Sequence, residues 1–130
     1  MKTLLDTFIP AEHGKVSAKE VSEGIHDILR MLGVSGRVLA HGLGIAEAQL
    51  HRMTTKKTGF YRPQTLAPFY RVAKLIEEAR HSLSERGVKS WLNRPNPYLN
   101  NLPPILCVRS DQELGKVVAQ LAAIRYGFPA

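Results

Sequence analysis

The sequence predicts an all-α protein, in which a helix-turn-helix region in the N-terminal and middle part packs against a small helical C-terminal domain. Two observations predict this class. Apolar residues recur at helical spacing in several segments that begin after a serine and end before a glycine. No run alternates apolar and polar residues for long enough to form a strand. With 130 residues, of which 44% are apolar, the chain is long enough to bury a core.

The first clear helix is predicted over residues 18–32. Ser17 and Glu20 have the spacing of a capping box, and Gly33 is a typical stop. The helix has one apolar face, made of Val21, Ile25, Ile28, Leu29 and Leu32. Residues 1–17 precede it as an N-terminal arm whose role stays open, because they suit either a short docking helix or a loose arm.

Residues 18–63 are predicted to form a helix-turn-helix DNA-binding region, centred on "GRVLAHGLGIAEAQLHRMTT" at residues 36–55. Ala40 supplies the small residue where two helices approach, and Gly44 suits the left-handed turn between them. Apolar residues flank the turn and follow the second helix: Leu39, Leu43, Ile45, Leu50 and Met53. Two short helices joined by glycine also occur in all-α proteins that never touch DNA.

Charge favours the DNA-binding interpretation. The net charge is +7, which indicates an anionic partner, and no acidic residue lies between Glu47 and Glu77. The second helix exposes Ala46 and Ala48, so few base-edge hydrogen bonds and modest specificity are expected. The predicted DNA contacts are Arg37, Glu47, His51, Arg52, Lys56, Lys57 and Arg62. The alternative for Lys56 and Lys57 is a solvated loop.

Residues 64–130 are predicted to form the C-terminal domain. One helix starts at or just before Pro68, because proline is tolerated only near a first turn. Its apolar side is expected to hold Leu66, Phe69, Tyr70, Ala73, Ile76 and Ala79. Ser110 and Glu113 form a second capping box and begin a last helix that ends at Gly127. That helix has an apolar face made of Leu114, Val117, Val118, Leu121 and Ile124.

The two helices are joined by a segment, "WLNRPNPYLNNLPP" at residues 91–104, that is rich in proline and asparagine but also apolar. A helix begun near Leu83 is expected to end with Trp91 and Leu92 anchored in the core. The next residues stop it, since Pro95 and Pro97 block helix and Asn96 can bond open backbone groups. Three side chains are expected to hold this loop against the domain: Tyr98, Leu99 and Leu102. Pro104 starts a further short helix.

No catalytic, metal or cofactor site is predicted. The five histidines lack ligand spacing, and the single cysteine, Cys107, lies in the apolar stretch "PPILCV" as a small buried hydrophobe. We therefore expect neither enzyme activity nor a cofactor. A lone cysteine, with no signal peptide and no membrane-spanning run, predicts a cytoplasmic protein without a membrane partner.

Residues 88–130 resemble the antitoxins of the MbcA/ParS/Xre group, and residues 25–87 resemble them more loosely. The resemblance rests on Trp91, Leu92, Pro95, Asn96, Leu99, Pro104 and Gly127. Two positions depart from the family pattern. Asn101 stands where the family usually has glycine, and asparagine tolerates the same left-handed backbone. Leu106 stands where the family often has aspartate, which removes any polar contact of that residue.

The resemblance implies a type II antitoxin that binds and blocks a cognate RES-family, NAD-degrading toxin and represses its own operator. It also implies a homodimer within a larger toxin-antitoxin complex. The expected toxin contacts are Arg94, Tyr98, Arg125, Tyr126, Gly127, Phe128, Pro129 and Ala130. Gly127 stops the last helix and Pro129 blocks its resumption, so the final residues are expected to leave as an extended plug; the alternative is a frayed terminus.

Two other functions stay open at this point. The chain suits a stand-alone transcriptional regulator whose C-terminal domain only dimerises. It also suits an interaction protein with a degenerate helix-turn-helix, because the second helix of that unit exposes alanine residues.

Overall fold

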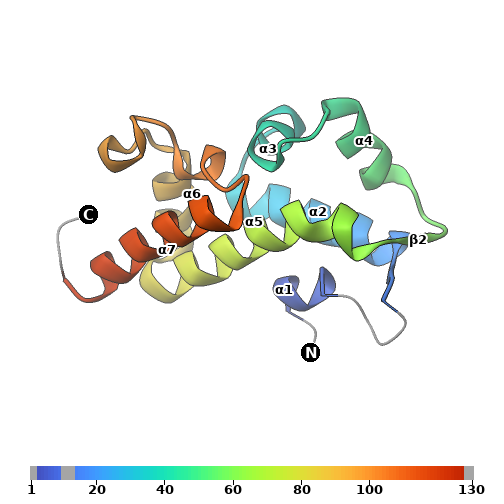
Figure 1. Cartoon of the computed structure of the whole chain (residues 1–130), viewed down its shortest axis with the longest axis horizontal. Helices are drawn as coiled ribbons and strands as arrows, with labels where there is room; N and C mark the ends of the chain where they lie inside the picture. Colours follow the sequence, from blue (N-terminus) through green and yellow to red (C-terminus); the bar gives the residue numbers. More distant parts are fainter. Residues whose placement is uncertain (1–2, 10–13, 128–130) are drawn as a thin grey trace.

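Seven α-helices account for most of residues 3–9 and 14–127, which are the residues that this computed structural model describes (Figure 1). They are α1 (Leu4–Thr7), α2 (Ala18–Leu32), α3 (Gly36–Leu43), α4 (Glu47–Thr55), α5 (Pro63–Ser82), α6 (Glu85–Asn93) and α7 (Asp111–Arg125). Two 3₁₀ turns, η1 (Pro97–Leu99) and η2 (Pro104–Leu106), lie between α6 and α7. The predicted all-α class is confirmed.

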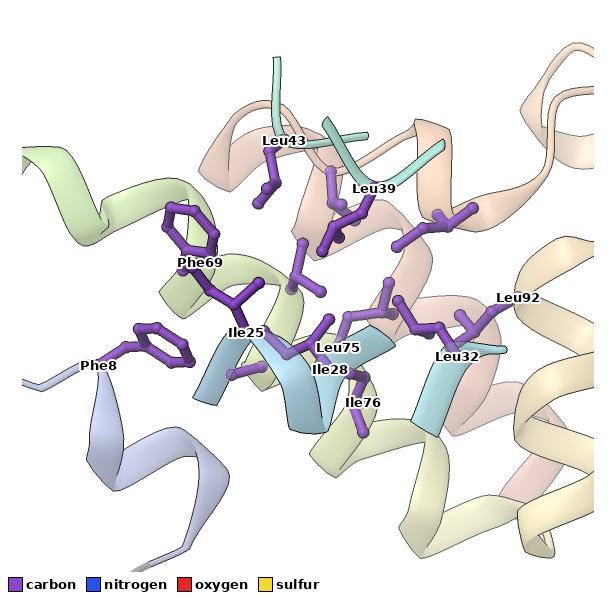
Figure 2. Close-up of a cluster of buried hydrophobic side chains, with 14 of the residues drawn as sticks. Phe8, Ile25, Ile28, Leu32, Leu39, Leu43, Phe69, Leu75, Ile76 and Leu92 are labelled. Carbon is purple, nitrogen blue, oxygen red and sulfur yellow. The ribbon is translucent and has the colours of Figure 1, made fainter. Parts of the chain in front are cut away.

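Helix α5 lies at the centre, and α1, α2, α3, α6 and α7 all pack against it. Its buried residues point in several directions: Leu66, Phe69, Val72, Ala73, Leu75, Ile76 and Ala79. Figure 2 shows Phe69, Leu75 and Ile76 among side chains from α2, α3 and α6. The core is therefore continuous from the N-terminal part of the chain to the C-terminal part.

The predicted start of α5 was wrong. The helix begins at Pro63, at a position where a missing N–H costs nothing, and Pro68 lies inside it. Burial of Leu66 and Phe69, on either side of Pro68, offsets the one helical hydrogen bond that this proline cannot donate. Tyr70 is also exposed (37%) rather than part of the buried side.

Helix α2 has the predicted bounds. The Ser17 hydroxyl accepts a hydrogen bond from the Glu20 backbone N–H, and Gly33 ends the helix with a φ of +66°. Helix α7 also begins as expected, with the Ser110 hydroxyl accepting from the Glu113 N–H. The Glu113 carboxylate accepts from the backbone N–H of Arg109, one residue before the cap.

A two-stranded antiparallel ribbon, β1 (Val16–Ser17) and β2 (Phe60–Tyr61), was not predicted. Val16 lies opposite Tyr61 and Ser17 opposite Phe60, and the Ala18 N–H donates to the Gly59 carbonyl at 2.9 Å. Strands of two residues are too short to show alternation in the sequence.

The N-terminal arm contains a docking helix within residues 3–9. Thr3 and Asp6 form a capping box at the start of α1. Phe8, which is 2% exposed, stacks on Phe69 of α5 with ring centroids 5.6 Å apart. The first of the two open interpretations of the arm therefore applies to these residues.

Helix α3 touches the segment before α7 directly. A Cβ placed on Gly42 would lie 2.5 Å from the carbonyl oxygen of Ile105, so no side chain fits there. The Arg109 guanidinium donates to the His41 carbonyl, from Nε at 3.1 Å and from an Nη at 2.7 Å. This contact, which we call the α3–η2 junction, joins the middle of the chain to its C-terminal part.

The junction predicts the effect of adding a methyl group at Gly42. We expect Gly42→Ala to lower the free energy of unfolding by about 1–3 kcal/mol, because either α3 or η2 must shift. Gly115→Ala in α7 is the matched control, since its Cβ meets nothing within 4 Å. It should raise stability by about 0.5–1 kcal/mol through helix propensity. Urea unfolding followed by circular dichroism measures both, and equal stability of Gly42→Ala and wild type contradicts the junction.

Candidate functional site

The pair of short helices predicted in the middle of the chain is present. Gly44 ends α3 in the left-handed conformation, with a φ of +75°, and its N–H donates to the Ala40 carbonyl at 2.9 Å. The residues expected to pack these helices are buried or half-buried: Leu39, Ala40, Leu43, Ile45, Leu50 and Met53. Most of the remaining side chains of α4 are exposed.

The residues predicted to contact DNA are all exposed. Glu47, His51 and Arg52 lie together on α4, while Arg37 lies at the start of α3. Lys56, Lys57 and Arg62 follow in the segment that leads from α4 to α5. This segment and α4 lie at one end of the molecule, on the right in Figure 1.

Two of these residues also have partners inside the protein. The Lys56 ammonium lies 5.3 Å from the centre of the Tyr61 ring, a cation–π distance, and burial raises the pKa of Tyr61. The Lys57 ammonium lies 3.4 Å from the hydroxyl of Ser22. Both lysines therefore help to hold the chain that follows α4, besides carrying charge at the surface.

The C-terminal end of α4 is fastened to α2. The buried Ser22 hydroxyl donates to the Thr54 carbonyl at 2.6 Å, and His26 Nε2 lies 3.3 Å from the same oxygen. These contacts fix the orientation of α4 relative to α2.

The segment between α6 and α7 is built as a rigid loop. Trp91 and Leu92 are buried, as predicted. The Asn96 side chain accepts from the Tyr98 N–H at 2.9 Å and donates to the Gln120 side chain of α7 at 2.7 Å. Asn101 has a φ of +63°, which confirms the expected left-handed backbone. Pro104 begins η2, as predicted.

The expectation that three apolar side chains hold this loop was wrong for two of them. Leu99 is buried, but Tyr98 is 63% exposed and Leu102 is 45% exposed. The Asn96 hydrogen bonds, including a backbone pairing with Leu102, already close the loop, so it does not need those side chains. Arg94, also exposed, lines a hollow of about 100 Å³ beside Trp91 and Asn96.

The end of α7 presents one further exposed aromatic residue, Tyr126, at 70%. Arg125 instead turns back to the fold, donating to the Ser82 hydroxyl at 3.3 Å and pairing with Glu78 at 3.6 Å. Gly127 has a φ of +81°. Phe128, Pro129 and Ala130 lie outside the described residues. In Figure 1 the loop after α6 and the end of α7 lie at the end of the molecule opposite α4.

Two exposed apolar residues at these surfaces were missed by sequence reasoning. Phe60, at 60% exposure, lies on β2 beside the basic segment, and Leu102, at 45%, lies on the loop after α6. Alternation along β2 places Phe60 and Tyr61 on opposite faces, but a two-residue strand gives no periodic signal for this.

Within residues 3–9 and 14–127, no cluster of histidine, cysteine or acidic residues is placed to hold a metal ion. Burial, and then the charge of Glu113, raises the pKa of the Cys107 thiol, which therefore stays protonated at neutral pH. Over the same residues, no helix is long and apolar enough to cross a membrane.

Comparisons with known proteins give a domain match over part of the chain and a similar fold. The model of the antitoxin Xre/MbcA/ParS C-terminal toxin-binding domain matches residues 84–127, from the residue that caps α6 to the glycine after α7. A chain of the crystal structure of the M. tuberculosis MbcT-MbcA toxin-antitoxin complex is similar, with a TM-score of 0.61 and 20% sequence identity. The similarity covers 84% of this chain and 96% of that one. Curated proteins give no match.

The family match includes the loop after α6 and the exposed Tyr98, Leu102 and Tyr126. At 20% identity the structural match supports a shared fold and nothing more. It extends well beyond the segment that the family model covers. Over residues 84–127, therefore, the resemblance to the Xre/MbcA/ParS antitoxins is confirmed, and the fold of most of the chain agrees with it.

Proposed function

We propose that this protein is the antitoxin of a type II toxin-antitoxin pair and acts without enzyme activity of its own, by binding and blocking a toxin. The observation that carries the proposal is the match of residues 84–127 to a toxin-binding domain. The fold shared with a chain of a toxin-antitoxin complex supports it. The resemblance further favours a RES-family toxin that degrades NAD.

The proposed toxin surface consists of Arg94, Tyr98, Leu102 and Tyr126. Tyrosine and arginine are enriched among the residues that carry binding energy at interfaces. The loop that presents Tyr98 is already fixed by Asn96, so little conformational entropy is lost when a partner binds. Arg125 contributes mainly by holding the end of α7 to α5.

We further propose that the C-terminal residues Phe128 to Ala130 enter the approach to the toxin's active site. They directly follow the exposed Tyr126 and the left-handed Gly127. A short apolar tail leaving from the proposed toxin surface would block access without contributing chemistry of its own.

The proposed second activity is operator binding by α4 and the basic segment after it. The exposed Arg37, Arg52 and Arg62 suit phosphate contacts, and Glu47 with His51 faces solvent where base edges would lie. The proposed homodimer would present two copies of α4 and raise the modest specificity that the exposed Ala48 implies. Because α4 lies opposite the proposed toxin surface, one chain could hold both partners.

One observation favours a second candidate, an interaction protein that binds the toxin but not DNA. Ala46 and Ala48 are exposed at the start of α4, where side chains able to bond bases would be expected. Footprinting on the DNA upstream of the gene separates this candidate from the autorepressor.

Removing both tyrosines should weaken toxin binding. We expect Tyr98→Ala with Tyr126→Ala to raise the dissociation constant for the toxin by about 30-fold or more, the range of interface hot spots. Calorimetry with the cognate RES-family toxin measures this. Tyr70→Ala on α5, also exposed but away from this surface, is the matched control and should bind as wild type. Unchanged affinity of the double variant would contradict the proposed surface.

Shortening the tail should separate binding from inhibition. We expect deletion of residues 127–130 to leave the toxin complex intact on gel filtration while NAD consumption by the toxin returns. Co-expression then no longer prevents growth arrest. Full protection by the shortened chain argues against the plug and leaves the toxin surface itself untouched.

Reversing charge after α4 should weaken DNA binding without regard to sequence. We expect Lys56→Glu with Lys57→Glu to lower affinity for every duplex alike, and to reduce the salt dependence by about 0.9 per lost phosphate contact. The control pair Arg86→Glu with Lys116→Glu makes the same charge change elsewhere on the surface. Gel shifts on the upstream DNA measure the affinity of each variant, and thermal unfolding confirms that each one is folded. If the Lys56→Glu, Lys57→Glu variant binds with the affinity of wild type, this segment does not take part in operator binding.

A further inference from the structure

The β1–β2 ribbon has two unlike faces. Val16 and the opposing Tyr61 point inward, with Val16 4% exposed and Tyr61 half-buried. Ser17 and the opposing Phe60 point the other way, and Phe60 remains 60% exposed. A large apolar ring is therefore held outward by strand pairing, although the opposite face of the same ribbon packs on the core.

Two cations lie next to this ring, both at the same end of the ribbon, because the pair after Val16 and Tyr61 is Lys15 and Arg62. Lys15 precedes β1 and Arg62 follows β2, and side chains two apart on a strand share a face. The pleat, continued by one residue, thus places both cations on the side of Phe60, and both are exposed. Neither takes part in an ion pair within residues 3–9 and 14–127. We call Lys15, Ser17, Phe60 and Arg62 the ribbon face.

The ribbon face is fixed in position relative to α4. The Ala18 N–H bonds the Gly59 carbonyl, and the Lys56 ammonium lies over the ring of Tyr61 behind Phe60. Only residues 56–59 separate the end of α4 from β2, and Figure 1 shows both at the same end of the molecule. Whatever meets the ribbon face therefore lies beside whatever meets α4.

We propose that the ribbon face is a second contact to duplex DNA, next to the groove in which α4 is proposed to lie. Lys15 and Arg62, opposite each other at one end of the ribbon, bind neighbouring phosphates, and Phe60 beside them packs against deoxyribose or enters the minor groove as an apolar wedge. Charge selects this partner, since the two cations beside the ring continue the basic segment at Lys56 and Lys57. The inference rests on the proposed operator binding. It adds a contribution of Phe60 to the free energy of DNA binding that does not depend on salt.

The test is fluorescence anisotropy with the full chain and a labelled duplex from its upstream region, over a series of salt concentrations. Phe60→Ala should weaken binding by about five- to tenfold at every salt concentration, with the salt slope unchanged. Lys15→Gln with Arg62→Gln should reduce the slope by about 1.8, for two phosphates. Tyr98→Ala, an equally exposed aromatic at the other end, and Arg86→Gln with Lys116→Gln are the controls and should change neither quantity.

The outcomes are distinguishable. If wild type binds the duplex and Phe60→Ala binds it with the same affinity, the ribbon contact is overturned. Operator binding by α4 then stays in place. Loss of toxin binding by Phe60→Ala, or a preference of wild type for the single strand, overturns it in favour of another partner. Failure of wild type itself to bind any duplex removes operator binding, and the ribbon contact with it. Phe60→Thr, which keeps strand propensity, repeats the test if Phe60→Ala lowers the melting temperature.

Discussion

The burial of α5 is the constraint on which the rest of the structure depends. This helix carries buried apolar side chains over roughly half of its circumference, and five other helices pack against it. Helix α5 contacts elements at both ends of the molecule. The ribbon leads directly into its first residue, Pro63, while Glu78 and Ser82 in its last turns hold Arg125 of α7. A displacement of α5 would therefore disturb the proposed DNA surface and the proposed toxin surface together.

Local signals predicted the elements that have local causes. Ser17 and Gly33 mark both ends of α2, and Gly44 marks the turn between α3 and α4, because capping and left-handed backbone act within a few residues. The ribbon could not be predicted, since Val16 and Tyr61 are far apart in the sequence and pair over only two residues. The start of α5 was misjudged because local rules exclude an internal Pro68, whereas core burial tolerates it.

The candidate surfaces were predicted unevenly for the same reason. Exposure of the charged residues on α4 follows from helical geometry, so it could be read from the sequence. The internal contact of Lys57 with Ser22, across 35 positions, could not. The loop after α6 was identified from the sequence through family resemblance. The interaction that holds it, the Asn96–Gln120 hydrogen bond, is seen only in the structure, where Tyr98 is exposed.

The α3–η2 junction has a consequence for how such a protein can diverge. Gly42 and the Ile105 carbonyl lie too close for any side chain between them, and Arg109 ties the same segment to His41. Substitution of the outward side chains of the loop, the proposed toxin contacts among them, therefore leaves this junction intact, whereas a shift of the η2 backbone would require α3 to move as well. The side chains of the loop can thus vary, and with them the choice of partner, while the backbone beneath them is held in place by α3.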